Sequence, residues 1–250
     1  MKELGNVERL KKARIHPIQV LSALRVYSAG GQNSYYSRSK GDPFTPVAQI
    51  NNALEKAFYA SFGNVEPTGK RTFLALDVSS SMGGGEIAGV PGLTPREAEA
   101  AMVMATVKAE WGTNDNITYP MYQVATFDTG LTPIALDPTM SLRSVTEKLS
   151  KWGGGSTDCS APMIYAEQHN IPVDAFVVYT DNETHSGRIH PSKALDSYRK
   201  KTGIPAQLIV VGFTATESSI ARQDDAGMLD IVGFDSSAPG IMSDFIRGKL

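Results

Sequence analysis

A cluster of oxygen-bearing side chains follows the apolar run 72–76, which reads Thr-Phe-Leu-Ala-Leu. Asp77 comes directly after this run, and hydroxyl groups follow at Ser79 and Ser81. The run does not alternate with polar residues, which is typical of a strand buried on both faces of a parallel sheet. In open α/β sheets, ligands bind at the edge where such strands end. The spacing therefore predicts a site for a hard cation such as Mg²⁺, which prefers oxygen ligands.

Two later loops supply further oxygen donors to the same predicted edge of the sheet. Thr157 lies in the glycine-rich loop 153–158, and Asp181 follows a second apolar run at 175–180. Loops that leave the same edge of a sheet can bring their side chains together. The predicted metal ligands are Asp77, Ser79, Ser81, Thr157 and Asp181.

The charge of these five residues indicates what the metal would do. Two carboxylates can balance a divalent cation, whereas three hydroxyls add no charge. A site that stores Ca²⁺ would be expected to carry more acids and a bidentate Glu. We therefore expect Mg²⁺, with Mn²⁺ or Ca²⁺ as alternatives. The ion would keep a position open for a carboxylate or phosphate group of a partner.

Each of these residues also has a simpler interpretation. Serine and glycine after a strand most often form a turn or a helix cap, and Asp181 could cap a helix. Thr157 or Asp181 taken alone would favour that interpretation. The metal hypothesis depends on all five residues, each placed where a predicted strand or loop reaches the same edge.

Alternating strand and helix patterns surround these loops and predict a sheet built of βαβ units. The clearest helix start is 94–97, a capping box with proline at the first helical position, and this helix is expected to run towards Trp111. The segment 131–136 is expected to return as an antiparallel edge strand. Further helices are predicted at 141–152, 159–168, 190–199 and 238–246, and further strands at 119–127, 207–211 and 227–234.

The N-terminal part of the chain differs, because it predicts helices without strands. A short amphipathic pattern lies at 4–11, and Pro17 opens an apolar helix that ends before Gly30. The polar segment 30–43 is predicted as a loop, and Thr45 caps a third helix. These helices are too few to bury a core alone. We therefore expect a helical segment, 1–66, docked on a second domain, 67–250.

Composition restricts the class of protein. Hydrophobic residues make up 41% of the 250 residues and charged residues 20%, as in globular proteins with a sizeable core. With 24 Lys and Arg against 26 Asp and Glu, the net charge of −2 argues against a dominant nucleic-acid surface. The single cysteine excludes an internal disulfide, and no apolar run approaches transmembrane length. These features, with a polar start unlike a signal peptide, predict a cytoplasmic protein without membrane contact.

The sequence 77–82, DVSSSM after an apolar strand, resembles the metal-ion-dependent adhesion site of von Willebrand factor A domains. The loop 153–158 and the strand end at 175–184 follow in the order that this family uses. The resemblance implies a doubly wound, mostly parallel, Rossmann-like sheet with helices on both faces. It also implies direct ligation by Ser79 and Ser81, and direct or water-mediated ligation by Thr157, Asp77 and Asp181.

A more specific resemblance covers nearly the whole chain. The segments that resemble the Ro autoantigen family are 11–17, 62–82, 153–166, 177–201 and 224–235. Members of this family, bacterial relatives included, are ring-shaped RNA-binding proteins of non-coding RNA quality control. They join a ring of helical repeats to a von Willebrand A domain. The resemblance implies a C-terminal fragment of a bacterial relative, containing the end of the ring and the A domain.

The family resemblance also implies partners. In the family, stem-loop Y RNAs bind the outer ring, and single-stranded ends of misfolded RNAs enter its hole. Most of that ring would lie outside this chain, which agrees with the near-neutral charge. We expect weak, nonspecific RNA binding by this fragment, an acidic or phosphate ligand at the metal, and a protein partner at the metal face. The glycine-rich loop 83–94 departs from the family motif and could alter access to the metal.

Two other functions remain open, although we expect a binding module rather than an enzyme. A metal-assisted phosphoryl-transfer or hydrolytic enzyme would need a base near the metal, and Glu183 and Asp158 are the nearby candidates. Cys159 could act as a nucleophile, but a lone cysteine that opens a helix is more often a small buried residue. The second alternative is a structural domain with an empty metal site.

Overall fold

A six-stranded sheet lies at the centre of the protein. The computed structural model describes residues 17–30, 44–61, 65–87, 92–111, 121–181, 186–214, 220–235 and 237–250. The strand order is β3-β2-β1-β4-β5-β6, and every neighbouring pair is parallel except β2 with β3. The strands are β1 (Thr72–Asp77), β2 (Tyr122–Phe127), β3 (Leu131–Ile134), β4 (Ala175–Thr180), β5 (Gln207–Gly212) and β6 (Met228–Val232). This sheet confirms the predicted doubly wound α/β fold and its antiparallel edge strand.

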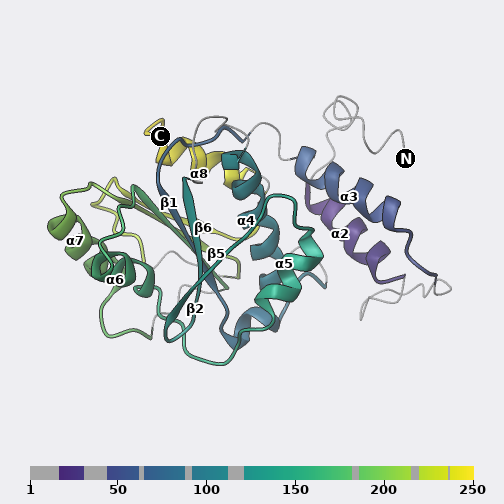
Figure 1. Cartoon of the computed structure of the whole chain (residues 1–250), viewed down its shortest axis with the longest axis horizontal. Helices are drawn as coiled ribbons and strands as arrows, with labels where there is room; N and C mark the ends of the chain where they lie inside the picture. The colour runs from purple at the N-terminus through teal and green to yellow at the C-terminus, as the bar shows by residue number, and fades with distance from the viewer. Residues whose placement is uncertain are drawn as a thin grey trace.

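Helices cover both faces of the sheet (Figure 1). One layer holds α4 (Pro95–Trp111), α5 (Leu142–Leu149) and α8 (Ala238–Ile246), and the other holds α6 (Ala161–Gln168) and α7 (Pro191–Thr202). Every residue of β1 is buried, because Leu74 and Leu76 belong to one hydrophobic cluster while Phe73 and Ala75 belong to the other. Burial on both faces explains why the apolar run of β1 does not alternate with polar residues.

A pair of helices lies outside the α4–α5 layer (Figure 1). α2 (Pro17–Ser28) and α3 (Ala48–Ser61) pack on each other, and Leu21 and Phe58 join the same hydrophobic cluster as Val103 of α4. The backbone N–H of Leu142 donates to Oε1 of Glu55 on α3 at 2.7 Å. The helices therefore dock on the sheet domain, as their small number predicted. The division into 1–66 and 67–250 stays a prediction.

Several element boundaries differ from the prediction, for local reasons. α5 begins at Leu142 because the Ser141 side chain accepts the Ser144 N–H at 3.1 Å. α6 begins at Ala161, two residues after the predicted start at 159, because Oδ1 of Asp158 accepts the N–H of Ser160 in a turn. The predicted helix at 4–11, most of the predicted loop at 30–43 and the start of the strand at 119–127 lie outside the described residues.

The strand order creates a switch point between β1 and β4. From β1 the chain proceeds outward to β2 and β3, whereas β4, β5 and β6 extend the sheet on the other side. Asp77 is the last residue of β1, and Asp181 directly follows β4. The crevice at such a switch point is where open α/β sheets bind ligands.

Among the described helices, none combines the length and the apolar character needed to cross a bilayer.

Candidate metal centre

The carboxyl group of Asp77 lies at the centre of the site. The residue is completely buried, and its Oδ1 accepts the backbone N–H of Ser79 at 2.8 Å. Its Oδ2 accepts the hydroxyl of Thr180 at 2.7 Å, and the hydroxyl of Thr157 lies 3.4 Å from the same oxygen. These contacts hold the carboxyl in one orientation at the end of β1.

The two serines of the motif project from a tight turn after β1. Residues Ser80–Gly83 form a single 3₁₀ turn, η1, and Ser79 immediately precedes it. The hydroxyl oxygens of Ser79 and Ser81 lie 3.1 Å apart, with Ser79 buried and Ser81 exposed. The turn therefore places two hydroxyls side by side directly after β1, as the alternate spacing predicted.

Thr157 reaches the site from a loop that neighbouring segments hold in place. The backbone N–H of Asp158 donates to the carbonyl of Asp128, after β2, at 2.9 Å. The carbonyl of Thr157 accepts both the N–H and the hydroxyl of Ser186, at 2.9 and 2.8 Å. These bonds leave the Thr157 hydroxyl directed at Asp77.

Asp181 comes to the site directly after β4. It is buried, and its carbonyl accepts the N–H and the hydroxyl of Thr214, both at 2.6 Å. Its negative charge contributes to the raised pKa of Asp77. The structure thus brings Asp77, Ser79 and Thr157 together, with Ser81 beside Ser79. Asp181 follows β4, the strand that pairs with β1.

The electrostatics of the site favour a cation. Burial raises the pKa of Asp77, and Asp181 raises it further, while hydrogen bonds from Thr180 and Ser79 act in the opposite direction. Two nearby carboxylates in a buried place repel each other unless a positive charge neutralises them. Their oxygens and the hydroxyls form the hard donor set that Mg²⁺ prefers, so the residues present fit such an ion. Within the described residues, no three His, Cys, Asp or Glu side chains form a candidate metal cluster.

Three residues that support the site were not predicted from the sequence. Thr180 bonds Asp77 from β4, and Arg96 donates through Nη2 to the carbonyls of Ser79 and Val78, at 3.1 and 3.4 Å. The third residue, Glu99, is completely buried on α4. The available signal for Glu99 was a single acid within the run 98–105, where the other residues are Ala, Met and Val.

The candidates for catalysis have structural surroundings of their own. Oδ1 of Asp158 accepts the N–H and the hydroxyl of Ser160, at 3.0 and 2.6 Å, so this carboxyl closes a local turn. Cys159 is completely buried in the cluster beneath α6, as expected for a small core residue. Glu183 lies outside the described residues.

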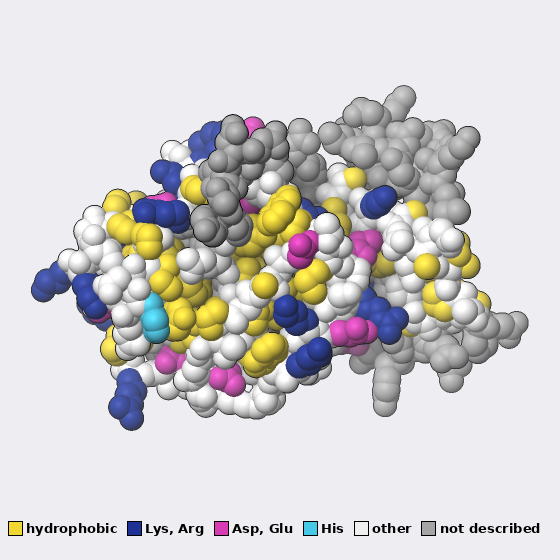
Figure 2. All heavy atoms as spheres, in the orientation of Figure 1, with side chains coloured by type: hydrophobic (Ala, Val, Ile, Leu, Met, Phe, Trp, Pro, Cys, Tyr) yellow, Lys and Arg dark blue, Asp and Glu magenta, His cyan; other side chains and the backbone are white. Residues whose placement is uncertain are grey.

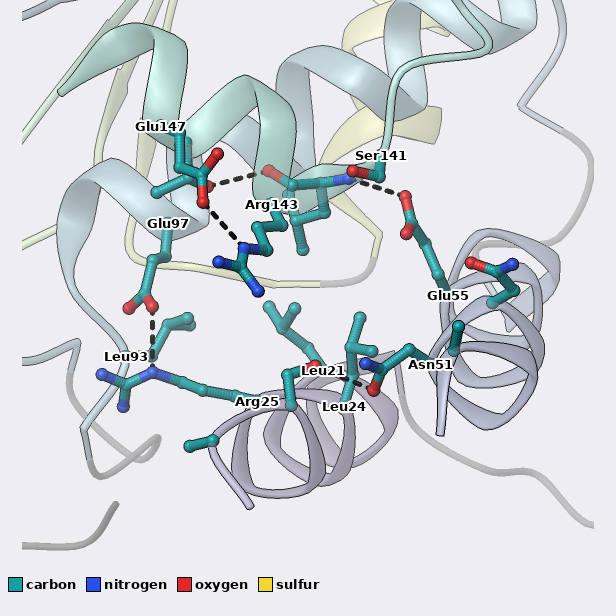
Figure 3. Close-up of a pocket in the computed structure, with 16 residues that line it drawn as sticks. Leu21, Leu24, Arg25, Asn51, Glu55, Leu93, Glu97, Ser141, Arg143 and Glu147 are labelled. Atoms are coloured by element: carbon teal, nitrogen blue, oxygen red, sulfur yellow. Dashed lines mark hydrogen bonds and ion pairs between the residues drawn. The ribbon is translucent and has the colours of Figure 1, made fainter. Parts of the chain in front are cut away.

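A separate cavity of about 520 Å³ lies between the α2–α3 pair and the α4–α5 layer (Figure 3). Leucines, among them Leu21 and Leu24, form part of its lining, and two ion pairs, Arg25–Glu97 and Arg143–Glu147, lie at its polar side. None of the five predicted metal ligands lines this cavity. It belongs to the junction of the helical pair with the sheet domain.

The basic side chains do not form a single patch on the face shown in Figure 2. Lys and Arg are distributed at separate places around its edge and across its centre. Several basic residues of the described chain are paired with acids, as in Arg199–Asp225 at 2.6 Å and Arg222–Asp196 at 2.7 Å. On this face, the distribution matches the near-neutral charge of the chain and gives no extended surface for a phosphate backbone.

Comparison with known proteins identifies similar sequences and similar structures. A family model described as the Ro60 vWA domain matches residues 71–246. The whole chain is 44% identical to "RNA-binding protein RO60" of Deinococcus radiodurans and 38% identical to the protein of the same name in Caenorhabditis elegans. It spans 44% and 36% of the lengths of these relatives. A crystal structure of the D. radiodurans Ro (RSR) protein matches 99% of this chain and 47% of its own, at 43% identity and a TM-score of 0.76.

Proposed function

The chain belongs to the Ro60 vWA domain family, and from this membership we propose that it is a metal-ion-dependent binding module of a Ro-type RNA-binding protein. The observation that carries the proposal is the environment of Asp77. This buried carboxyl is fixed through both oxygens, shares its edge of the sheet with Asp181 and has three hydroxyl side chains within reach of that edge. A divalent cation would neutralise the two carboxylates and complete the site.

The five predicted ligands would bind Mg²⁺ in two ways. Ser79 and Ser81 would bind the ion directly, and Asp77, Thr157 and Asp181 would bind it directly or through water. When bound, the ion would offer a Lewis-acidic position to a carboxylate or phosphate oxygen of a partner. Thr180 and Arg96 would act without touching the ion, because they hold the Asp77 carboxyl and the Ser79 backbone in place.

Metal binding can be tested by titration calorimetry of the 250-residue chain with MgCl₂ and MnCl₂. We expect saturable binding of one ion per chain and its loss in Asp77→Asn, which keeps the size of the side chain but removes its charge. Asp224→Asn is the matched control, because the side chain of Asp224 is 86% exposed. A wild-type chain that binds neither metal would contradict the proposal and favour a structural domain with an empty site.

The open metal position can be probed with acetate and inorganic phosphate, which carry the two candidate ligand groups. We expect either anion to bind the Mg²⁺-loaded chain more tightly than the metal-free chain. Asp77→Asn should remove this difference. Equal anion binding with and without metal would contradict an acidic or phosphate ligand at the ion.

For RNA, we propose a role within the longer protein. The two Ro60 relatives are named as RNA-binding proteins, and this chain corresponds to less than half of each. We propose that the whole protein binds Y RNA and misfolded RNA in non-coding RNA quality control, and that this chain alone binds RNA weakly. A filter-binding assay should give salt-sensitive, sequence-independent binding. Tight, sequence-selective binding by the chain alone would contradict this.

We propose binding rather than catalysis at the metal. A hydrolytic enzyme needs a general base within hydrogen-bond reach of the metal-bound ligand. Asp158 instead accepts two hydrogen bonds from Ser160, and Cys159 is buried. Phosphatase and nuclease assays with Mg²⁺ test this directly. Turnover that Asp77→Asn abolishes would overturn the proposal.

A further inference from the structure

Glu99 occupies an unusual place on α4. Its neighbours along the helix from Ala98 to Val103 are all completely buried, and the Glu99 side chain is completely buried as well. α4 packs on β1, which ends at Asp77, and on η1, which contains Ser81 and directly follows Ser79. A carboxyl group therefore lies in the interior, on the inner side of the predicted metal centre.

The burial of the Glu99 carboxyl is only partly compensated by its neighbours in the described structure. Neither Oε1 nor Oε2 has a hydrogen bond, and both oxygens are inaccessible to solvent. A buried polar group without a hydrogen bond is costly, and a buried charge without a partner is more costly still. The fold therefore retains a group that destabilises it unless something else contacts that group.

The charges around Glu99 favour a cation nearby. Burial raises the pKa of Glu99 well above its usual range, and the negative charges of Asp77 and Asp181 raise it further. Arg96 and the backbone of Asp77 act in the opposite direction. A divalent cation would offset the repulsion among these three acids.

We propose that Glu99 is a positioning acid of the metal centre, which lies behind Asp77 and reaches the bound ion through a water molecule. The inference rests on the proposed metal-binding function. Mg²⁺ keeps several of its waters in proteins, so a carboxylate outside direct contact can still accept a hydrogen bond from one of them.

A structural role for Glu99 makes a different prediction. If the carboxyl served only packing, its replacement by an amide of the same shape would change the stability of the metal-free chain and leave metal affinity unaltered. If Glu99 serves the ion, Glu99→Gln should weaken metal binding. Since this substitution removes a buried acid beside two others, it should leave the metal-free chain as stable as wild type or more so.

Glu110 provides a matched control on the same helix. It is also buried, and its Oε1 accepts the N–H of Thr68 at 2.7 Å. Eleven residues separate it from Glu99, which corresponds to about 16 Å along an α-helix. Glu110→Gln therefore changes a buried glutamate of α4 at the far end from the metal centre.

The test combines calorimetry with Mg²⁺ and Mn²⁺ and thermal melting without metal, on the 250-residue chain. We expect Glu99→Gln to bind both ions about tenfold more weakly or worse, as is usual for residues behind a metal ligand, and Glu110→Gln to stay within twofold of wild type. Equal affinities in wild type and Glu99→Gln would overturn the inference while the metal site stands. A Glu99→Gln chain that fails to fold without metal would also overturn the inference, because the carboxyl would then be needed for folding and not for metal binding. A wild-type chain without metal binding would remove the proposed function and the inference together.

Discussion

The hydroxyl of Thr180 donates a 2.7 Å hydrogen bond to Oδ2 of Asp77, so the last residue of β4 supports the last residue of β1. Both side chains are completely buried. The contact spans the switch point of the sheet, and it fixes one oxygen of the carboxyl on which the proposed metal centre depends. The other oxygen accepts the N–H of Ser79, so both ends of the carboxyl are held before any ion binds.

Replacing Thr180 with valine should show how much this hydrogen bond contributes to stability and to metal affinity. Valine keeps the shape of threonine but cannot donate, so a buried carboxylate oxygen would lose its shortest hydrogen bond. We expect the free energy of unfolding in urea to fall by about 1–3 kcal/mol. We also expect metal affinity to fall, because the Asp77 carboxyl becomes free to rotate. Thr180→Ser retains the hydroxyl and is the control. Equal metal affinity in the two variants would contradict a role for this hydrogen bond in the site.

The opposite end of the sheet is held by Arg71 and Asp174, which join the starts of β1 and β4. Oδ2 of Asp174 accepts two hydrogen bonds of 2.9 Å from Arg71, one from the backbone N–H and one from Nε. Oδ1 of Asp174 accepts a third from Nη2 of Arg71. Both side chains are partly exposed, which limits the contribution of the pair to about 1 kcal/mol. We expect Asp174→Asn to lower the free energy of unfolding by that amount at pH 7.

This contribution should depend on pH in a defined direction. The hydrogen bond from Arg71 lowers the pKa of Asp174 below its usual 3.8. A carboxyl whose folded pKa is lowered stabilises the protein above the unfolded pKa, and that stabilisation disappears as the pH falls through the folded pKa. The difference in unfolding free energy between wild type and Asp174→Asn should therefore be constant from pH 5 to 7 and shrink below about pH 4. A difference that grows with acid would contradict the assignment.

The fold of the sheet domain could be predicted from sequence because its signals are local. Unbroken apolar runs at β1 and β4 indicated strands buried on both faces. At the start of α4, the capping box is confirmed, because the N–H of Thr94 donates to Oε2 of Glu97 at 2.9 Å and the N–H of Glu97 donates to Oγ1 of Thr94 at 3.3 Å. Where a side chain bonded the backbone nearby, as at Ser141, the boundary moved by a residue or more.

The supporting residues of the site could not be predicted in the same way. Thr180 meets Asp77 across 103 positions of the chain, and only the pairing of β1 with β4 brings them together. Arg96 and Glu99 lie on α4, a helix whose rotation about its axis is set by its packing on β1. Sequence patterns locate residues at the ends of strands, but they do not reveal which helix side chains lie beneath those ends.

The α2–α3 pair should unfold together with the sheet domain. Phe58 of α3 is completely buried in the cluster that also contains Val103 of α4 and Leu149 of α5. We expect Phe58→Ala to lower the free energy of unfolding by about 3–5 kcal/mol, through lost burial and the remaining cavity. Val26→Ala, at a position 48% exposed on α2, should change it by less than about 0.5 kcal/mol. Coincident urea transitions by circular dichroism and tryptophan fluorescence would support one cooperative unit, whereas two separate transitions would favour independent domains divided near residue 66.

The last prediction concerns Glu97, which has two separate functions in the structure. Its Oε2 closes the capping box with Thr94, and its Oε1 accepts Nε of Arg25 on α2 at 3.0 Å (Figure 3). Glu97→Gln removes the charge but preserves an acceptor for the cap, since glutamine also forms capping boxes. Glu97→Ala removes both interactions. We expect Glu97→Ala to lower the free energy of unfolding by about 1–2 kcal/mol, and Glu97→Gln by less than about 1 kcal/mol.

A double-mutant cycle separates the ion pair from the cap. Both side chains of the Arg25–Glu97 pair are 26% exposed, so a coupling energy of about 0.5–1 kcal/mol is expected between Arg25→Met and Glu97→Gln. This coupling should decrease as NaCl is raised, because salt screens partly exposed charges. The cost of Glu97→Ala that remains in Arg25→Met should not decrease, because the cap is a short-range hydrogen bond. A coupling energy near zero at low salt would show that α2 is held on α4 by its leucines alone.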